Sequence, residues 1–263
     1  MSNAMHVKDD YSLNEPRVKP PPQPHSIPVP FAYFPSDDGT DENLLVLLHG
    51  LGDSHEPFAS LGRQLRLPQT AVLALRAPQQ IPFLEERAFQ WYTSFDPLGD
   101  IIPNPDPTRA LELLTKVLRY LTEECHWRTD KIHLLGFAQG GSVAAEVALR
   151  WWLNELSSSG KEVSLARRAF LGSVVTISGP LLSYPTPSSP CPTHVLLFAR
   201  SADAKVTAAF KKGFATLTEV VKRGQEGMPR SREEWEPIMR FWSERLSKRP
   251  GEGLFEVMTG GTA

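Results

Sequence analysis

Five short apolar runs spread along the chain constrain its fold more than any other feature of the sequence. Each run has the length of a strand and is apolar almost throughout, which is typical of strands buried on both faces of a sheet. Stretches with helical spacing lie between them. We therefore predict an α/β fold with a mostly parallel central sheet and helices on both faces. The runs are Asn43–His49, Thr70–Leu75, Lys131–Phe137, Phe170–Ser178 and Thr193–Ala199.

Four stretches of the sequence are predicted to be helices. Pro107–Glu123 places its leucines on one face and has a proline at its start, where a helix tolerates one. Ser231–Leu246 begins with a serine followed three residues later by Glu234, which is the spacing of a capping box. The other two predicted helices are Gln139–Leu153 and Val206–Val221.

Composition excludes several classes of protein. The chain has 263 residues, 41% hydrophobic and 22% charged, which suits a globular domain with a sizeable core. A formal net charge of −2 argues against a protein that binds nucleic acid or an anionic membrane through bulk charge. No apolar run approaches the roughly 18 residues of a membrane span. With two cysteines, Cys125 and Cys191, and no secretory pattern at its start, we expect a cytoplasmic protein without disulfides.

The first 30 residues differ in composition from the rest. Seven of them are proline, which disfavours helix and favours extended polyproline conformations. We predict that residues 1–30 form a tail that is disordered or laid on the surface, and that residues 31–263 form the α/β domain. A proline-rich ligand for an SH3-type partner is the alternative for this tail.

A first glycine motif directly follows the run that ends at His49. Gly50 and Gly52 flank Leu51, so the backbone can turn sharply and present N–H groups at the carboxyl end of the sheet. Open α/β sheets bind their ligands at that edge. A plain strand-to-loop turn accounts for these glycines equally well.

A second glycine motif, with the sequence GFAQGG, spans residues 136–141. It lies between a predicted strand and a predicted helix and has the frame of the nucleophile elbow, G-x-S-x-G. At such an elbow the middle side chain points into a pocket, and the next backbone N–H helps to form an oxyanion hole. The middle position of this chain is Ala138.

With these motifs the chain resembles the phospholipase/carboxylesterase branch of the α/β-hydrolases, which includes the acyl-protein thioesterases. The resemblance covers residues 31–206 and implies the α/β-hydrolase fold. It also implies hydrolysis of carboxylic esters and thioesters with neither a metal nor an organic cofactor. The similar segments are 47–58 (LLHGLGDSHEPF), 75–80 (LRAPQQ), the loop at Trp91, 134–149 (LLGFAQGGSVAAEVAL), 176–181 (TISGPL) and 199–206 (ARSADAKV).

The resemblance also implies roles for individual residues, and two of these roles lack the residue they need. It places the nucleophile at Ala138, the oxyanion donors at the backbone of Leu51 and Gln139, and the triad acid at Asp203. Alanine has no nucleophilic atom. The histidine of this fold follows the acid in the chain, but the last histidine here, His194, precedes Asp203.

Three residues could substitute for the missing groups, and each also has a plain structural interpretation. Ser142 lies one helical turn beyond the elbow, Ser178 lies in the turn of the TISGPL segment, and His55 lies in a loop near the expected pocket. A new triad needs positions set to fractions of an ångström, which disfavours a rebuilt centre.

Two explanations for the missing groups stay open. Alanine at an elbow could be engineered, although engineering would not remove a histidine. Alternatively, Gly253–Gly260 is the final strand, Ser231–Leu246 is an insertion before it, and a histidine follows beyond Ala263. We expect instead that the chain ends here without that base.

Two functional hypotheses follow. The first is a catalytically impaired serine-hydrolase homologue, a pseudoenzyme whose cleft binds a small acyl or carboxylate ligand or a protein partner. The second is a carboxylesterase or acyl-thioesterase in a disabled or truncated form. The expected pocket residues are His49, Gly50, Gly52, His55 and Trp91. In a rival arrangement this cleft is filled by Phe83, Leu84 or Phe89.

Overall fold

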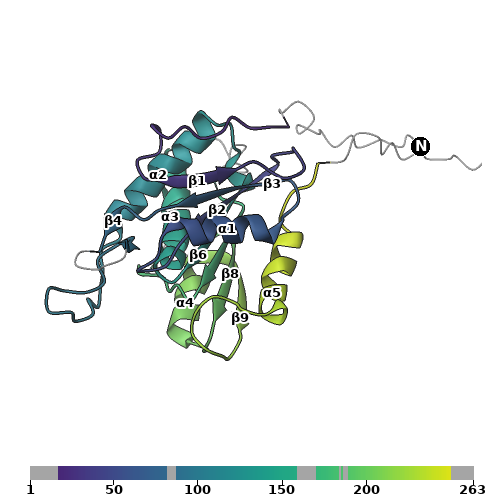
Figure 1. Ribbon diagram of the computed structural model, residues 1–263. Coiled ribbons are helices and arrows are strands. Elements are labelled where there is room, and N and C mark those ends of the chain that lie inside the picture. The colour runs from purple at the N-terminus through teal and green to yellow at the C-terminus, as the bar shows by residue number, and fades with distance from the viewer. Residues whose placement is uncertain (1–16, 82–86, 159–169, 184, 186–188, 250–263) are drawn as a thin grey trace, which may run out of the picture.

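A computed structural model describes residues 17–81, 87–158, 170–183, 185 and 189–249 (Figure 1). Within these ranges seven strands form one sheet in the order β1-β3-β2-β6-β7-β8-β9. The strands are β1 (Phe31–Phe34), β2 (Asn43–Leu48), β3 (Thr70–Leu75), β6 (Ile132–Phe137), β7 (Ser173–Ile177), β8 (Cys191–Ala199) and β9 (Phe214–Val221). Two further strands, β4 (Gln79–Gln80) and β5 (Phe89–Gln90), form a small antiparallel pair.

The central sheet is parallel except at one edge. β1 pairs with β3 in the antiparallel direction, whereas every other neighbouring pair is parallel. The five apolar runs of the sequence become β2, β3, β6, β7 and β8, and β2 and β3 are buried at every position. This confirms the predicted α/β fold with a mostly parallel sheet.

Helices cover both faces of the sheet. Buried residues of α2, α3 and α4 belong to one core cluster, and buried residues of α1 and α5 belong to a second cluster on the other face. The helices are α1 (His55–Leu65), α2 (Thr108–Glu123), α3 (Gln139–Ser158), α4 (Ala204–Gly213) and α5 (Arg232–Ser243), with a short 3-10 turn at Thr129–Lys131.

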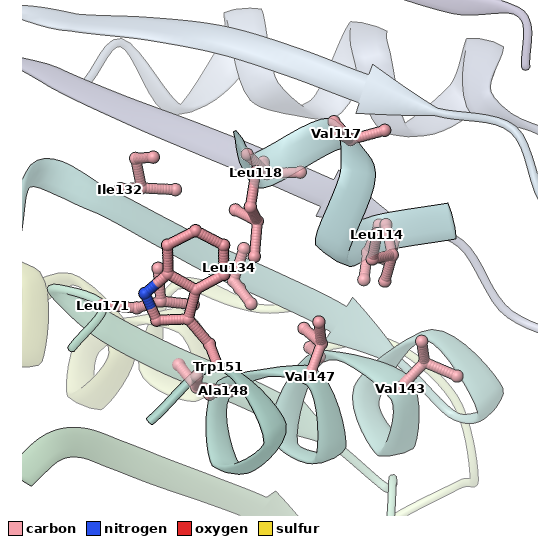
Figure 2. Packing of buried hydrophobic residues seen from close by; sticks show 14 of the residues in the cluster. Leu114, Val117, Leu118, Ile132, Leu134, Val143, Val147, Ala148, Trp151 and Leu171 are labelled. Atoms are coloured by element: carbon pink, nitrogen blue, oxygen red, sulfur yellow. The ribbon is translucent and has the colours of Figure 1, made fainter. Parts of the chain in front are cut away.

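The first core layer is built from complementary apolar faces. Figure 2 shows Leu114 and Leu118 of α2 on the side of α3 that carries Val147 and Trp151, with Leu134 of β6 between the two helices. All five side chains are at most 5% exposed. The small residues early in α3 let that helix lie close to the sheet, and this closeness positions the turn that precedes it.

The described part of the proline-rich segment lies along the body of the protein, beside β1 and α2 (Figure 1). The Lys19 N–H donates to Asp41 Oδ2 at 3.0 Å, and the Gln23 N–H donates to the Tyr120 hydroxyl at 2.9 Å. Ile27 is only 3% exposed and belongs to the core cluster of α2 and α3. Residues 17–30 therefore contribute to the core.

One predicted helix is wrong. The stretch Val206–Val221 is not continuous, because α4 ends at Gly213 and Phe214–Val221 is strand β9, parallel to β8. At the edge of the described part of the sheet, β9 has one buried, four half-buried and three exposed residues, so it lacks the uniformly apolar character of the central strands. Strand β1 and helix α1 were not predicted either. The strand predicted at Gly253–Gly260 lies outside the described residues.

No helix among the described residues is long and apolar enough to span a membrane.

Candidate functional site

Ala138 lies at the turn between β6 and α3, at the carboxyl edge of the sheet. Its backbone is left-handed, with φ of +49°. Its N–H donates to Ile177 O at 2.8 Å, and its carbonyl accepts from Ser142 N at 3.0 Å. A left-handed conformation costs a non-glycine residue about 1–2 kcal/mol, and such strain concentrates at functional sites. The elbow geometry is therefore present without a nucleophile.

Two glycines of the GFAQGG motif are required by packing alone. A Cβ atom on Gly136 would lie 2.1 Å from Gly140 O, and one on Gly140 would lie 2.2 Å from Leu48 O. Both distances are far below van der Waals contact with backbone atoms that cannot move. These glycines let the start of α3 lie directly against β2 and β6.

Gln139 acts through both its backbone and its side chain. As the first residue of α3, its N–H has no acceptor within the helix. Its side-chain Oε1 accepts from Trp91 N at 2.9 Å, while Nε2 donates to Tyr92 O at 2.9 Å and Ser94 Oγ at 2.7 Å. The buried amide therefore fastens the loop at Trp91 to the elbow, and only the backbone N–H remains for a ligand.

His49 is a neutral, structural histidine. The Ala77 N–H donates to its Nε2 at 2.9 Å, so the ring proton is on Nδ1, which donates to Gly50 O at 2.7 Å. Burial lowers the pKa of His49 below its usual range, consistent with that neutral form. The His49 carbonyl accepts from the Trp91 indole N–H at 2.8 Å. Both side chains are 0% exposed, so they brace the loops instead of meeting solvent.

The loop from Gly50 to Asp53 is fixed against β5. Gly52 has a left-handed φ of +82°, and its N–H donates to Phe89 O at 3.0 Å. The Phe89 N–H in turn donates to Asp53 O at 3.2 Å. Leu51, between the two glycines, is 37% exposed. The backbone of Leu51 therefore lies at the protein surface, in a turn that is held by hydrogen bonds to β5.

In the rival arrangement, Phe83, Leu84 or Phe89 was expected to fill the cleft. Phe89 is 6% exposed, and the guanidinium carbon of Arg76 lies 4.2 Å from the centre of its ring. Phe89 is therefore packed into the body of the protein. Phe83 and Leu84 lie outside the described residues.

The candidate substitutes occupy three different places. Ser142 is 0% exposed inside α3. Ser178 has a left-handed φ of +55° after β7, and its N–H donates to Phe198 O at 2.8 Å. His55 begins α1, is 8% exposed, and has its Nδ1 3.1 Å from Glu56 Oε2. Burial lowers the pKa of His55.

Asp203 lies in the loop after β8 and serves as the N-cap of α4. Its Oδ1 accepts from Lys205 N at 2.8 Å and from Val206 N at 3.1 Å. The side chain is exposed, and these two bonds satisfy backbone donors that the helix cannot satisfy itself. The carboxylate therefore has a structural partner that does not depend on a histidine.

The segment 222–231 joins β9 to α5 and contains no histidine. The family resemblance implies a histidine after Asp203 in the chain, and this segment is the first loop after β9. The Arg200 guanidinium holds it in place by pairing with both Glu234 oxygens and donating to Met228 O at 3.1 Å. Strand β9 follows Asp203 and precedes α5, whereas the strand at Gly253–Gly260, before which Ser231–Leu246 would be an insertion, lies outside the described residues.

Sequence reasoning missed this Arg200–Glu234 pair and the side-chain role of Gln139. Their partners are 34 and up to 48 residues away in the chain, so no local pattern reveals them. The one available signal in the sequence was Arg200 itself, a charged residue directly after the apolar run that ends at Ala199.

A cavity of about 190 Å³ lies beside Asp203, where β7 and β8 end. Its lining does not include His49 or Trp91. Residues that line it include Ser178, Gly179, Arg200, Asp203, Glu219 and Glu226.

Comparisons with known proteins agree with this geometry. The family model for phospholipase/carboxylesterase matches residues 34–154. An uncharacterized hydrolase of Mycosarcoma maydis is 37% identical over 229 residues, which cover 83% of this chain and 82% of that protein. The chain belongs to the phospholipase/carboxylesterase family. An uncharacterized hydrolase of Schizosaccharomyces pombe is 27% identical over 80% of this chain and 86% of its own length.

Solved structures share the fold of this phospholipase/carboxylesterase family member. Esterase PE8 aligns with a TM-score of 0.64 at 22% identity, over 83% of this chain and 99% of its own. Acyl-protein thioesterase 2 of Zea mays aligns with a TM-score of 0.59 at 21% identity, over 83% and 100% of the two chains. The family resemblance and the α/β-hydrolase fold are thereby confirmed.

Proposed function

We propose that this member of the hydrolase family is catalytically impaired and uses the elbow region as a binding cleft. The observation that carries the proposal is the left-handed turn at Ala138, which has the backbone of a nucleophile elbow and no side-chain oxygen. Acyl transfer in this fold begins with attack by that oxygen. Without it the backbone can bind a substrate-like group but cannot form the covalent intermediate.

The absence of a histidine after Asp203 supports the same proposal. The segment between β9 and α5 contains no histidine, and the Asp203 carboxylate accepts hydrogen bonds from the Lys205 and Val206 N–H groups at the start of α4. In a working triad the acid orients an imidazole that accepts the serine proton. Two of the three roles are therefore unfilled at the positions that the family pattern assigns.

The donors that remain define the proposed ligand. We assign the oxyanion donors to the backbone N–H groups of Leu51 and Gln139, the latter at the start of α3. Such donors favour a carboxylate or a carbonyl oxygen. The proposed ligand is a small acyl or carboxylate compound, or the corresponding group of a partner's peptide.

The binding proposal is tested with butyrate as the probe. We expect butyrate to raise the Tm of the purified chain in a saturable way. Ala138→Asp should abolish this rise, because its carboxylate would lie beside the same donors and repel the anion. Ala138→Asn is the matched control, since it has the same shape without the charge. A Tm unaffected by butyrate, or affected equally in both variants, overturns the proposal.

The catalytic part is tested with a p-nitrophenyl ester. We expect no hydrolysis beyond the level that oxyanion donors alone provide, which in triad-deficient enzymes is about 10³–10⁴-fold over water. Ala138→Ser should restore little, because no base accepts the hydroxyl proton. Robust turnover by the unmodified chain that is lost in His55→Ala would instead demonstrate a substitute base.

The alternative is a true carboxylesterase or thioesterase in a disabled form, and membership of a hydrolase family favours it. Its signature is large recovery of ester or thioester hydrolysis in Ala138→Ser.

We also propose a single domain over residues 31–263, preceded by the segment 1–30, in a cytoplasmic protein. Cys125 and Cys191 are buried and form no disulfide, which supports a reducing compartment such as the cytoplasm.

A further inference from the structure

The ring of His49 joins two segments that are far apart in the sequence. Its Nε2 accepts from the Ala77 N–H at 2.9 Å, in the loop after β3, and its Nδ1 donates to Gly50 O at 2.7 Å. Gly50 begins the turn that carries Leu51, and its carbonyl also accepts from Asp53 N at 3.4 Å. Through this one side chain, the turn from Gly50 to Asp53 is fastened to the segment at Ala77.

These two hydrogen bonds coexist only while the ring of His49 is neutral. The Ala77 N–H can donate but cannot accept, so Nε2 must be unprotonated to bond with it. A protonated imidazole carries an N–H group on each nitrogen, and one of the two would point at the Ala77 N–H. Protonation of His49 therefore breaks the bond to Ala77 by geometry alone.

The packing around His49 offers a buried cation no water. The side chain is 0% exposed, and its ring centre lies 5.6 Å from that of Trp91 and 6.4 Å from that of Phe58. Burial is the main reason why the pKa of His49 lies below 6.5. A protonated ring is therefore more stable once it has left this packing and reached solvent.

The titratable groups near His49 modify this effect without reversing it. The carboxylates of Asp53 and Glu56 favour the protonated ring and thus oppose the effect of burial, whereas His55 adds to it. Arg76, directly before Ala77 in the chain, acts on His55 and Glu56. The pKa of His49 stays lowered with all of these groups present.

We propose that protonation of His49 releases the turn from Gly50 to Asp53, so that the cleft keeps its oxyanion donors in place only while this histidine is neutral. The turn contains Leu51, whose N–H is one of the two donors assigned to the cleft. The release is a property of the chain itself, and only its effect on a ligand rests on the proposed function.

Hydrogen exchange followed by NMR tests the release. The Ala77 amide should be less protected than the amides of β6, which exchange on global unfolding, because the release is local. Its protection should fall by up to about tenfold per pH unit between pH 6.5 and the folded pKa of His49, since release takes up one proton. Protection of Ala77 that equals that of β6 at every pH, or that does not change with pH, overturns the proposal.

His49→Gln separates the titration of this ring from other effects of acid. Glutamine keeps an acceptor for the Ala77 N–H and does not titrate, so protection of Ala77 above the level of β6 should no longer depend on pH. His194→Gln is the matched control. Its pKa is also lowered by burial, but it pairs in register with Ser173 at the amino end of β7 and should leave the pH dependence at Ala77 unchanged. Equal pH dependence in His49→Gln and the unmodified chain overturns the proposal. If His49→Gln fails to fold, the comparison of Ala77 with β6 in the unmodified chain still decides.

Titration with 1-butanesulfonate extends the test to the ligand, because this probe stays anionic over the same pH range. We expect its binding to weaken at least about fivefold between about pH 7.5 and about pH 5, and to stay unchanged in His49→Gln. Equal affinity at both pH values overturns the coupling and leaves the binding cleft standing. Release without binding of sulfonate or butyrate at any pH leaves the release standing and overturns the ligand class proposed for the elbow.

Discussion

Ala138 retains a strained backbone although the chemistry that usually accompanies such strain is missing. Glycine adopts its φ of +49° without strain, whereas alanine pays about 1–2 kcal/mol. Glycine also loses up to about 1 kcal/mol through the freedom it gives the unfolded chain. Ala138→Gly is therefore expected to raise the free energy of unfolding by up to about 1 kcal/mol in urea denaturation.

Ala138→Val provides the opposite case for the same measurement. A β-branched residue is an outlier at positive φ, so this variant should unfold at lower urea concentration than the unmodified chain. If valine were tolerated as well as glycine, the turn would have relaxed and the strain argument would be wrong.

The side chain of Gln139 is expected to matter for stability as well. Gln139→Ala leaves the buried Trp91 N–H without its acceptor, which costs about 1–3 kcal/mol. Gln139→Glu keeps an acceptor for that N–H but cannot donate to Tyr92 O, so it should be destabilised too. Equal stability of all three proteins in urea would show that the loop is held by other contacts.

At the residue scale, the GFAQGG motif could be recognised in the sequence, whereas the side-chain hydrogen bonds of Gln139 could not be predicted from it. The G-x-A-x-G frame between a predicted strand and a predicted helix was sufficient to predict the elbow from six residues. The bonds of Gln139 to Trp91 and Ser94 join positions more than 40 residues apart, and they exist only once the sheet has formed. Cavities share this property, because they depend on every element around them.

Among the elements, the segment between β9 and α5 is held in part by the ion pair of Arg200 and Glu234. Hydrogen bonding to the Arg200 guanidinium, and then to the Arg230 N–H, lowers the pKa of Glu234 from 4.5 to about 2. A lowered carboxyl pKa adds stability that is complete above the unfolded pKa and is lost as pH falls toward the folded pKa. Stability from this pair should therefore decline from about pH 4.5 to pH 2.

Glu234→Gln tests this pH dependence directly. At neutral pH the variant leaves Arg200, whose side chain is 3% exposed, without its counter-charge, so it should be clearly less stable. The difference from the unmodified chain in urea unfolding should shrink as pH is lowered through 4 toward 3. Glu236→Gln, on an exposed pair with Arg240, is the control with little expected effect. If the difference in stability between Glu234→Gln and the unmodified chain stays constant with pH, the lowered pKa of Glu234 does not account for it.

The one misread element has a physical explanation. α4 and β9 follow each other without a loop, and their combined run has enough apolar residues for a long helix. Two local signals favoured a break: Gly213 at the end of α4, and the alternating β-branched Thr216, Thr218 and Val220. As an edge strand β9 is only half-buried, so it lacks the continuous apolar character that identified the other parallel strands.

For the whole molecule, the repeated apolar runs were sufficient to predict the architecture. Strands buried on both faces need helices on both sides, and parallel strands need crossovers, so the order of elements determines the layers. The pairing of β1 with β3 and the placement of residues 17–30 could not be predicted. Both depend on surface complementarity between distant parts, such as the bond from Gln23 N to the Tyr120 hydroxyl.

The last prediction concerns the proposed domain boundary at residue 31. Ile27 lies before this boundary, yet it is 3% exposed and packs in the core cluster of α2 and α3. Truncation of a buried isoleucine to alanine typically costs about 2–5 kcal/mol, and a surface segment that can readjust should fall near the lower value. Ile27→Ala should therefore lower the free energy of unfolding by about 2 kcal/mol in urea denaturation.

His25→Ala is the matched control, because His25 is exposed in the same segment and its loss should change little. If both variants are as stable as the unmodified chain, the segment is a dispensable tail and the boundary at residue 31 is the physical one. If only Ile27→Ala is destabilised, the folded domain begins before residue 31. The prolines around Ile27 then have a structural purpose, since they hold the chain extended so that its apolar side chain reaches the core.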